Sequence, residues 1–127
     1  MTPEAKEHFD KARQCLTRAR TTLAAGIGED AGRNAYLATF HAAQALIAER
    51  TGKDAKTHRG VHVQFARLTR NEPRIGLDLR QFLAQAYDIK SIADNGLGPD
   101  TDVPLDRAGK AIDTAELFVD GVMELLT

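Results

Sequence analysis

Residues 33–65 of the chain read RNAYLATFHAAQALIAERTGKDAKTHRGVHVQF. The first part of this stretch, up to Arg50, mixes alanines with larger apolar residues and leaves no fully polar side on a helix. A helix that is apolar nearly all round is buried against more than one neighbour. We therefore expect the central helix of an all-α protein here, running from about Asp30 to Arg50 and ending at Thr51-Gly52.

Four further helices are predicted around this one. The expected segments are a first helix from Thr2-Pro3 to Gly26, a short one from Thr57 to Arg70, a fourth over 77–94 and a last one from 102–104 onward. A loop is expected over residues 95–100. Short connections favour antiparallel neighbours, so the predicted fold is an up-and-down antiparallel helical bundle of four long helices and one short helix.

Apolar residues of the last helix recur at three- and four-residue steps, which predicts that they face inward. These residues are Leu105, Ala108, Ile112, Ala115, Val119, Val122 and Leu126. The apolar residues of the central helix cover more sides than one small bundle can bury. An apolar patch left exposed usually marks an interface, so we expect a homodimer.

The composition is that of one globular domain spanning residues 1–127. Apolar residues make up 43% and charged residues 28%, which is too apolar for intrinsic disorder. No apolar run approaches the roughly 18 residues that cross a bilayer, and the N-terminal residues lack the apolar segment of a secretory signal. The single cysteine, Cys15, fits a reducing compartment. We expect a cytoplasmic protein without membrane association.

Charge is unevenly distributed along the chain, although the net charge is only −1. Six cations and two acids lie between Lys53 and Arg74, whereas seven acids and two cations lie from Asn95 onward. This asymmetry indicates an anionic ligand or an acidic partner at the middle of the chain. Two solvated helix faces of opposite sign are the alternative.

The turn Lys56-Thr57-His58-Arg59 places cations at the start of a helix, where they oppose the helix dipole. A phosphate would relieve this conflict by binding the first-turn N–H groups and the two cations. The alternative is that Thr57 only caps the helix and the cations are solvated. His62 lies on the same helix face as His58 and completes this predicted ligand-binding group, together with Arg33 and Tyr36 on the central helix.

Metal binding and a catalytic centre are not indicated by residue spacing. His58 and His62 stand at i and i+4, but two ligands do not complete a site, and Arg59 between them disfavours a dication. We predict no metal and no cofactor. His41 lies at the edge of the face formed by Arg33, Tyr36 and Phe40, where a lone histidine is more often a packing residue. No nucleophile pattern and no carboxylate pair stands out.

Three segments carry a resemblance to the HEPN domain family (higher eukaryotes and prokaryotes nucleotide-binding). They are Arg33-x-x-Tyr36-x-x-x-Phe40-His41-Ala42-Ala43-x-Ala45-Leu46, then Lys56-Thr57-His58-Arg59-Gly60-Val61 with Phe65, and Ala86-Tyr87-Asp88-Ile89-Lys90 with Ala93-Asp94. The resemblance covers nearly the whole chain. It implies a helical bundle that commonly dimerises, a cytoplasmic setting, and pairing with a small nucleotidyltransferase-like protein, often as toxin and antitoxin.

Many members of the family are metal-independent ribonucleases that use an arginine followed four to six residues later by a histidine. Here seven residues separate Arg33 from His41 and Arg50 from His58, and no histidine has an arginine at the required distance. Lysine also stands at position 90, where the family pattern has arginine, and it lacks the planar guanidinium fork. Little or no metal-independent RNA cleavage is therefore expected.

Two functions remain open from the sequence. The first is a non-catalytic or weakly active module that binds the phosphate of a nucleotide or RNA and acts with a nucleotidyltransferase-like partner. The second is a ribonuclease toxin with a non-standard site around His41, His58 and Lys90.

Overall fold

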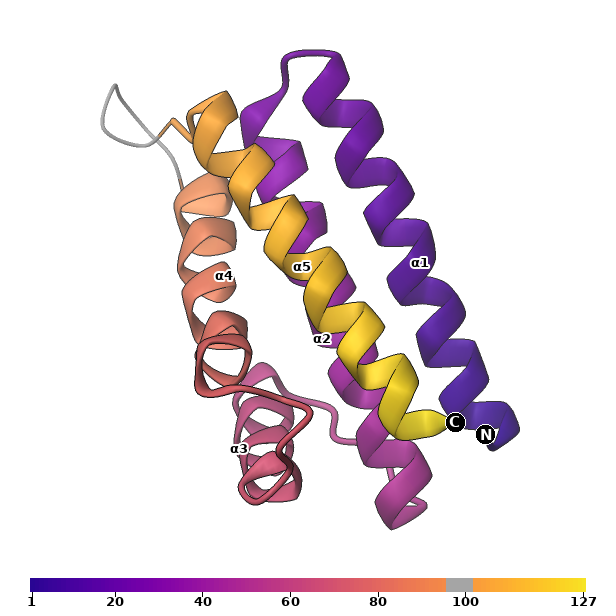
Figure 1. Cartoon of the computed structure of the whole chain (residues 1–127). Helices are drawn as coiled ribbons and strands as arrows, with labels where there is room; N and C mark the ends of the chain where they lie inside the picture. Colours follow the sequence, from indigo (N-terminus) through magenta and orange to yellow (C-terminus); the bar gives the residue numbers. More distant parts are fainter. Residues whose placement is uncertain (96–101) are drawn as a thin grey trace.

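The computed structural model describes residues 1–95 and 102–127, and all regular structure within these ranges is helical. The helices are α1 (Pro3–Ala24), α2 (Gly28–Thr51), α3 (His58–Thr69), α4 (Leu77–Asn95) and α5 (Leu105–Leu126). α1 and α4 run in one direction, α2 and α5 run in the other, and the short α3 lies at one end of the bundle (Figure 1). The predicted up-and-down bundle of four long helices and one short helix is confirmed. The loop predicted after Asn95 lies outside the described residues.

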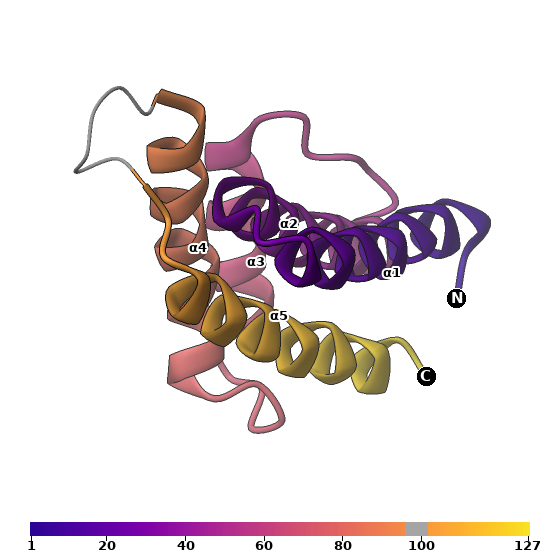
Figure 2. The same ribbon diagram turned by 90° about the horizontal axis from the view of Figure 1, so that it is seen from above.

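Helix α2 is the centre of the bundle, since it packs against each of the other four helices. Two views place α1 and α4 on opposite sides of it (Figures 1 and 2). Its alanines at 31, 35, 38, 42, 43 and 45 have no exposed surface, and neither do Tyr36 and Leu46. Burying one such large side chain contributes roughly 1.5–3 kcal/mol. One chain thus covers nearly all the apolar surface of α2, with Leu37 partly buried, so the exposed apolar patch on which the homodimer was predicted is not present on this helix.

Local sequence sets most helix ends. The Thr2 hydroxyl accepts the N–H of Ala5 at 3.1 Å at the start of α1, and Pro3 is its first residue. Gly52 ends α2 in the left-handed region, with φ of 70°, and its N–H donates to the Ala48 carbonyl. These ends are the predicted ones to within a residue.

The start of α2 differs from the prediction. It begins at Gly28 rather than Asp30, and the preceding Ile27 provides no side-chain cap. Gly28 packs directly against the backbone of Val103, whose carbonyl oxygen lies only 2.0 Å from where a Cβ would stand. The absence of a side chain lets the helix continue into this contact, which no local signal predicts.

The inward side of α5 is predicted with one error. Six of the seven residues are buried, but Leu105 is 48% exposed. Val103, which precedes the helix and is 4% exposed, fills the space against Gly32 of α2. Buried apolar side chains from all five helices form one cluster, in which Phe65 of α3 meets Phe118 of α5 at 4.9 Å between ring centroids. Among residues 1–95 and 102–127, none of the helices has the length and apolarity that crossing a bilayer requires.

Candidate functional site

The hydroxyl of Tyr36 joins two histidines of a neighbouring helix. Tyr36 comes from α2 and is fully buried, and its oxygen lies 2.7 Å from Nδ1 of His58 and 3.0 Å from Nε2 of His62. Both distances are those of hydrogen bonds. The i, i+4 spacing on α3 therefore places two imidazoles around one hydroxyl.

Aromatic rings hold this group in place. Tyr87 of α4 packs at 5.3 Å, between ring centroids, from both Tyr36 and His58, and at 5.6 Å from His62. Phe40, one helical turn after Tyr36, lies 4.7 Å from the His58 ring. Separations of this size are favourable for aromatic pairs. The ring positions are thus fixed by three helices.

Burial sets the protonation of the group. It lowers the pKa of His58, and the Lys90 cation lowers it further. Burial lowers the pKa of His62 too, and His58 adds to this effect. The pKa of the Tyr36 hydroxyl is raised by burial and by Tyr87. Near pH 7 both imidazoles are therefore neutral and the hydroxyl keeps its proton.

Charged side chains border the group of Tyr36, His58 and His62 on the α4 side. The Lys90 ammonium lies 6.0 Å from the centre of the Tyr87 ring and forms an ion pair with Asp94. Arg33 of α2 also pairs with Asp94, at 2.7 Å between Nε and Oδ1, and with Asp30. Hydrogen bonds from Lys90 and Arg33 lower the pKa of Asp94. Arg33 is consequently held between two carboxylates, whereas Lys90 pairs with Asp94 alone among the residues that the structure describes.

The start of α3 combines a satisfied cap with exposed cations. The Thr57 hydroxyl accepts the N–H of Gly60 at 2.9 Å, as predicted for an N-cap residue. Lys56 and Arg59 are exposed, and neither forms an ion pair with another residue in the described ranges. The two cations flank His58 in sequence and remain available to an anion.

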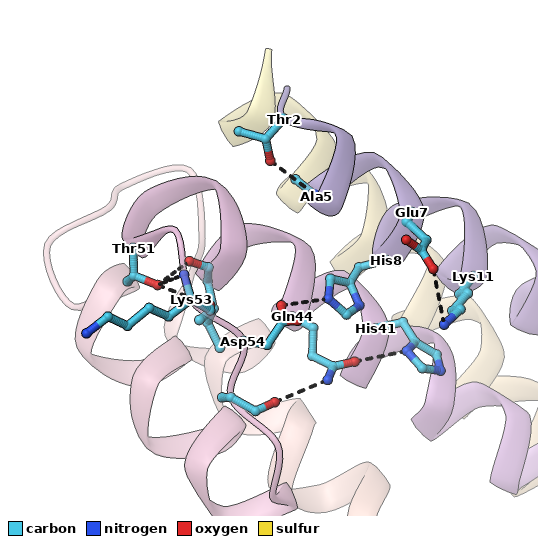
Figure 3. Close-up of polar contacts among 12 residues, drawn as sticks. Thr2, Ala5, Glu7, His8, Lys11, His41, Gln44, Thr51, Lys53 and Asp54 are labelled. Atoms are coloured by element: carbon cyan, nitrogen blue, oxygen red, sulfur yellow. Dashed lines mark hydrogen bonds and ion pairs between the residues drawn. The ribbon is translucent and has the colours of Figure 1, made fainter.

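His41 belongs to a different part of the molecule. Its Nδ1 lies 3.0 Å from the Gln44 side-chain oxygen, and the Gln44 amide donates to the Ala55 carbonyl at 3.3 Å (Figure 3). Burial lowers the pKa of His41, and the nearby Lys11 and His8 of α1 lower it further. The structure therefore brings His58 and Lys90 together but places His41 on the α1 side of α2. This location fits the packing role that the sequence favours.

Residue spacing missed two members of the group, Tyr87 and Asp94. Both lie on α4: Tyr87 is three residues before Lys90 and Asp94 is four residues after it. Residues at these spacings lie on the same face of a helix. This spacing in the sequence indicates that the three residues share a face of α4. Only the packing of α4 on α2 shows that this face contacts Tyr36 and Arg33. Within the described residues, no three His, Cys, Asp or Glu side chains are grouped so that they could hold a metal ion.

Comparison with known proteins decides the family. Residues 5–125 match the HEPN domain model. The chain belongs to the HEPN domain family. A UPF0332 protein of Archaeoglobus fulgidus is 33% identical over 116 residues, which are 91% of this chain and 90% of that protein. The crystal structure of TT1696 from Thermus thermophilus superposes with a TM-score of 0.81 at 22% identity, covering 97% of this chain and 98% of that one. The HEPN family predicted from the sequence is thereby confirmed. The similarity to the TT1696 structure supports the helical fold.

Proposed function

We propose that this HEPN protein binds the phosphate of a nucleotide or RNA on the face where α2, α3 and α4 meet. One observation carries the proposal: Arg33, Tyr36, His58, His62 and Lys90, far apart in sequence, lie together there. The face offers neutral imidazoles, the Lys90 ammonium and an aromatic surface. This combination suits a phosphate and a base of the same ligand.

The charge of the neighbouring segment supports an anionic ligand. Lys56 and Arg59 are exposed at the start of α3 beside His58, and the N–H groups of a helix start attract anions. The acidic C-terminal part of the chain would disfavour the same ligand on α5. Binding is therefore expected to be local and to weaken as salt is added.

Titration of a short single-stranded RNA and of AMP, followed by fluorescence or calorimetry, tests the proposal. Lys90→Gln should weaken binding, whereas Lys110→Gln on α5 removes the same charge elsewhere and should leave binding unchanged. Equal affinities of wild type and Lys90→Gln would remove this face as the site.

We further propose a cytoplasmic role with a nucleotidyltransferase-like partner, in the manner of a toxin–antitoxin pair. The family membership supports this role. Affinity purification from the native host, with the captured protein and any bound nucleotide identified by mass spectrometry, tests it. Capture without any nucleotidyltransferase-like protein would argue against the pairing.

A homodimer also remains a proposal. It rests on family membership, since α2 is covered within one chain. Light scattering at tens of micromolar would show twice the mass of a 13.9 kDa chain if it is correct. A clean monomer would refute it.

RNA cleavage without metal is the second candidate function. It is favoured by the hydrogen bonds of Tyr36 to two histidines that are neutral near pH 7. General acid–base chemistry needs such groups. An RNA-cleavage assay in EDTA separates this function from binding alone: His58→Ala should abolish cleavage, while His41→Ala, on the other side of α2, should not.

A further inference from the structure

The outward side of α5 carries a regular stripe of side chains that the bundle does not bury. In Figure 1, α5 lies in front of α2, between α1 and α4. The stripe residues follow one another at alternating steps of three and four positions, which places them on one face of the helix. The α5 stripe consists of Arg107, Lys110, Thr114, Leu117, Gly121 and Glu124, all exposed or half-buried. Leu117 is 61% exposed, more than any other large apolar side chain that the structure describes.

A groove between α4 and α5 runs beside the α5 stripe. It consists of two hollows that share Thr114 in their lining. The first hollow is also lined by the apolar side chains of Phe82 and Ile89 from α4 and by the two cations of the stripe. The second hollow is lined by the carboxylate residues Asp120 and Glu124. The surface is therefore basic at one end and acidic at the other, with apolar side chains between the two.

The charges along the α5 stripe are complementary to those of a second, antiparallel copy. Arg107 and Lys110 stand at the N-terminal end, and Asp120 and Glu124 stand at the C-terminal end. The spacing of the stripe is the same in both directions, so a two-fold axis at its midpoint pairs each position with one of the partner. Arg107 then faces Glu124 of the partner subunit, and Lys110 lies beside Asp120 of the partner subunit. Opposite charges meet at both ends of such an interface.

The middle of the stripe supplies an apolar fit. Thr114 and Leu117 are the two positions next to this axis, and each faces the other across it. Leu117 of one copy then enters the hollow beside Thr114 of the partner subunit, a hollow that has Phe82 and Ile89 in its lining. Removing an exposed leucine from water favours association, and two-fold symmetry repeats the contact.

The other acids of α5 lie outside the stripe. Arg20 of α1 forms ion pairs with both Asp113 and Glu116, which reduces the negative charge beside the midpoint. By contrast, the side chains at both charged ends of the stripe form no ion pair with another residue in the described ranges. They are therefore available to a partner.

We propose that the α5 stripe and the groove beside it form the surface through which two copies of this chain pair, antiparallel and about a two-fold axis. The inference deepens the homodimer proposal by naming its surface, and it rests on that proposal. None of the residues proposed to bind phosphate lines the groove, so the pairing leaves that site of each copy uncovered.

The first test reverses the charge at one end of the stripe and measures the dimer by sedimentation equilibrium. Arg107→Glu with Lys110→Glu should raise the dissociation constant of the dimer about tenfold or more, because like charges then face each other at both symmetric ends. Asp120→Lys with Glu124→Lys should have the same effect. The matched control is Arg67→Glu with Arg70→Glu, which makes an equal charge change on α3 and should leave the dimer intact.

Mixing the two charge-reversed proteins tests the symmetry directly. Each is expected to be a monomer alone, whereas the mixture should form a one-to-one heterodimer, because each reversed end then meets its opposite charge. Native mass spectrometry distinguishes the heterodimer by mass, and its formation shows that both variants are folded. Two monomeric variants that do not pair when mixed would overturn the antiparallel arrangement.

The apolar contact is tested by Leu117→Ser, which should also raise the dissociation constant about tenfold or more. Val63→Ser on α3 is the control, since Val63 is similarly exposed, at 57%, and lies off the stripe. Equal effects of the two changes would overturn the role of Leu117. A dimer that none of the α5 variants weakens would overturn this surface while leaving the homodimer proposal intact. A monomeric wild type would remove both, and would leave the groove to an unlike protein.

Discussion

The Tyr36 hydroxyl lies 2.7 Å from Nδ1 of His58, although the two residues are 22 positions apart in the chain. This contact does more than hold α3 against α2. A neutral hydrogen bond of this kind contributes only about 1 kcal/mol to stability. Its larger effect is to fix the ring of His58 between Phe40 and Tyr87, with one nitrogen turned inward. The same hydroxyl lies 3.0 Å from Nε2 of His62 and so holds the second histidine as well.

The free energy of unfolding should fall as the pH decreases below the ordinary histidine pKa of about 6.5. Burial lowers the pKa of His58 and His62 in the folded protein, so the unfolded chain binds more protons as the pH passes through the ordinary histidine value of about 6.5. The stability is complete above this value and is lost as the pH falls toward the lowered pKa values. Urea denaturation at several pH values measures the effect. His58→Gln combined with His62→Gln should reduce the slope, while His41, whose pKa is also lowered by burial, keeps part of it. An unchanged slope would contradict the assignment.

Loss of both exposed cations at the start of α3 should weaken binding of a phosphate-bearing ligand by about a hundredfold or more, since charge-assisted hydrogen bonds contribute roughly 1.5–3 kcal/mol each. The variant is Lys56→Ala with Arg59→Ala. Arg67→Ala with Arg70→Ala removes the same charge further along the segment and serves as the control. A smaller effect of the control indicates a local site. Equal effects would mean that the whole basic segment follows a polyanion.

Two glycine substitutions should have opposite effects on stability. Gly28→Ala should destabilise the protein by about 1–3 kcal/mol, because the new Cβ would overlap the Val103 carbonyl. Gly109→Ala in α5 should stabilise it by about 0.5–1 kcal/mol, since the Cβ meets only Leu23, at 3.7 Å, and alanine favours the helix. Thermal denaturation of both variants is the measurement. A stable Gly28→Ala protein would show that residues 102–104 do not pack on α2 as described.

Removal of the α3 cap should destabilise the short helix. Thr57→Ala loses the hydrogen bond to the Gly60 N–H and should cost about 1 kcal/mol. Thr57→Ser keeps the bond and is the matched control. Hydrogen exchange of the α3 amides would locate the effect, and unchanged exchange in Thr57→Ala would show that the cap contributes nothing.

Most of the fold could be predicted because its signals are local. Proline and threonine mark the start of α1, Gly52 marks the end of α2, and Thr57 starts α3. Apolar spacing identified the buried side of α5 at six of seven positions. The errors, at Gly28 and Leu105, both occur where Val103 packs on α2. A contact between residues this far apart in sequence leaves no local pattern.

The candidate site was only partly predictable. The sequence by itself determined the helices, the position of the central one, the cation pair at the start of α3 and the i, i+4 histidines, because each depends on neighbours within one helical turn or one cap. Tertiary structure decided which face of α4 meets these histidines, that Tyr36 links them, and that His41 is turned toward α1. These relationships depend on the rotation and crossing of packed helices, which are fixed by the fit of side chains across the whole core.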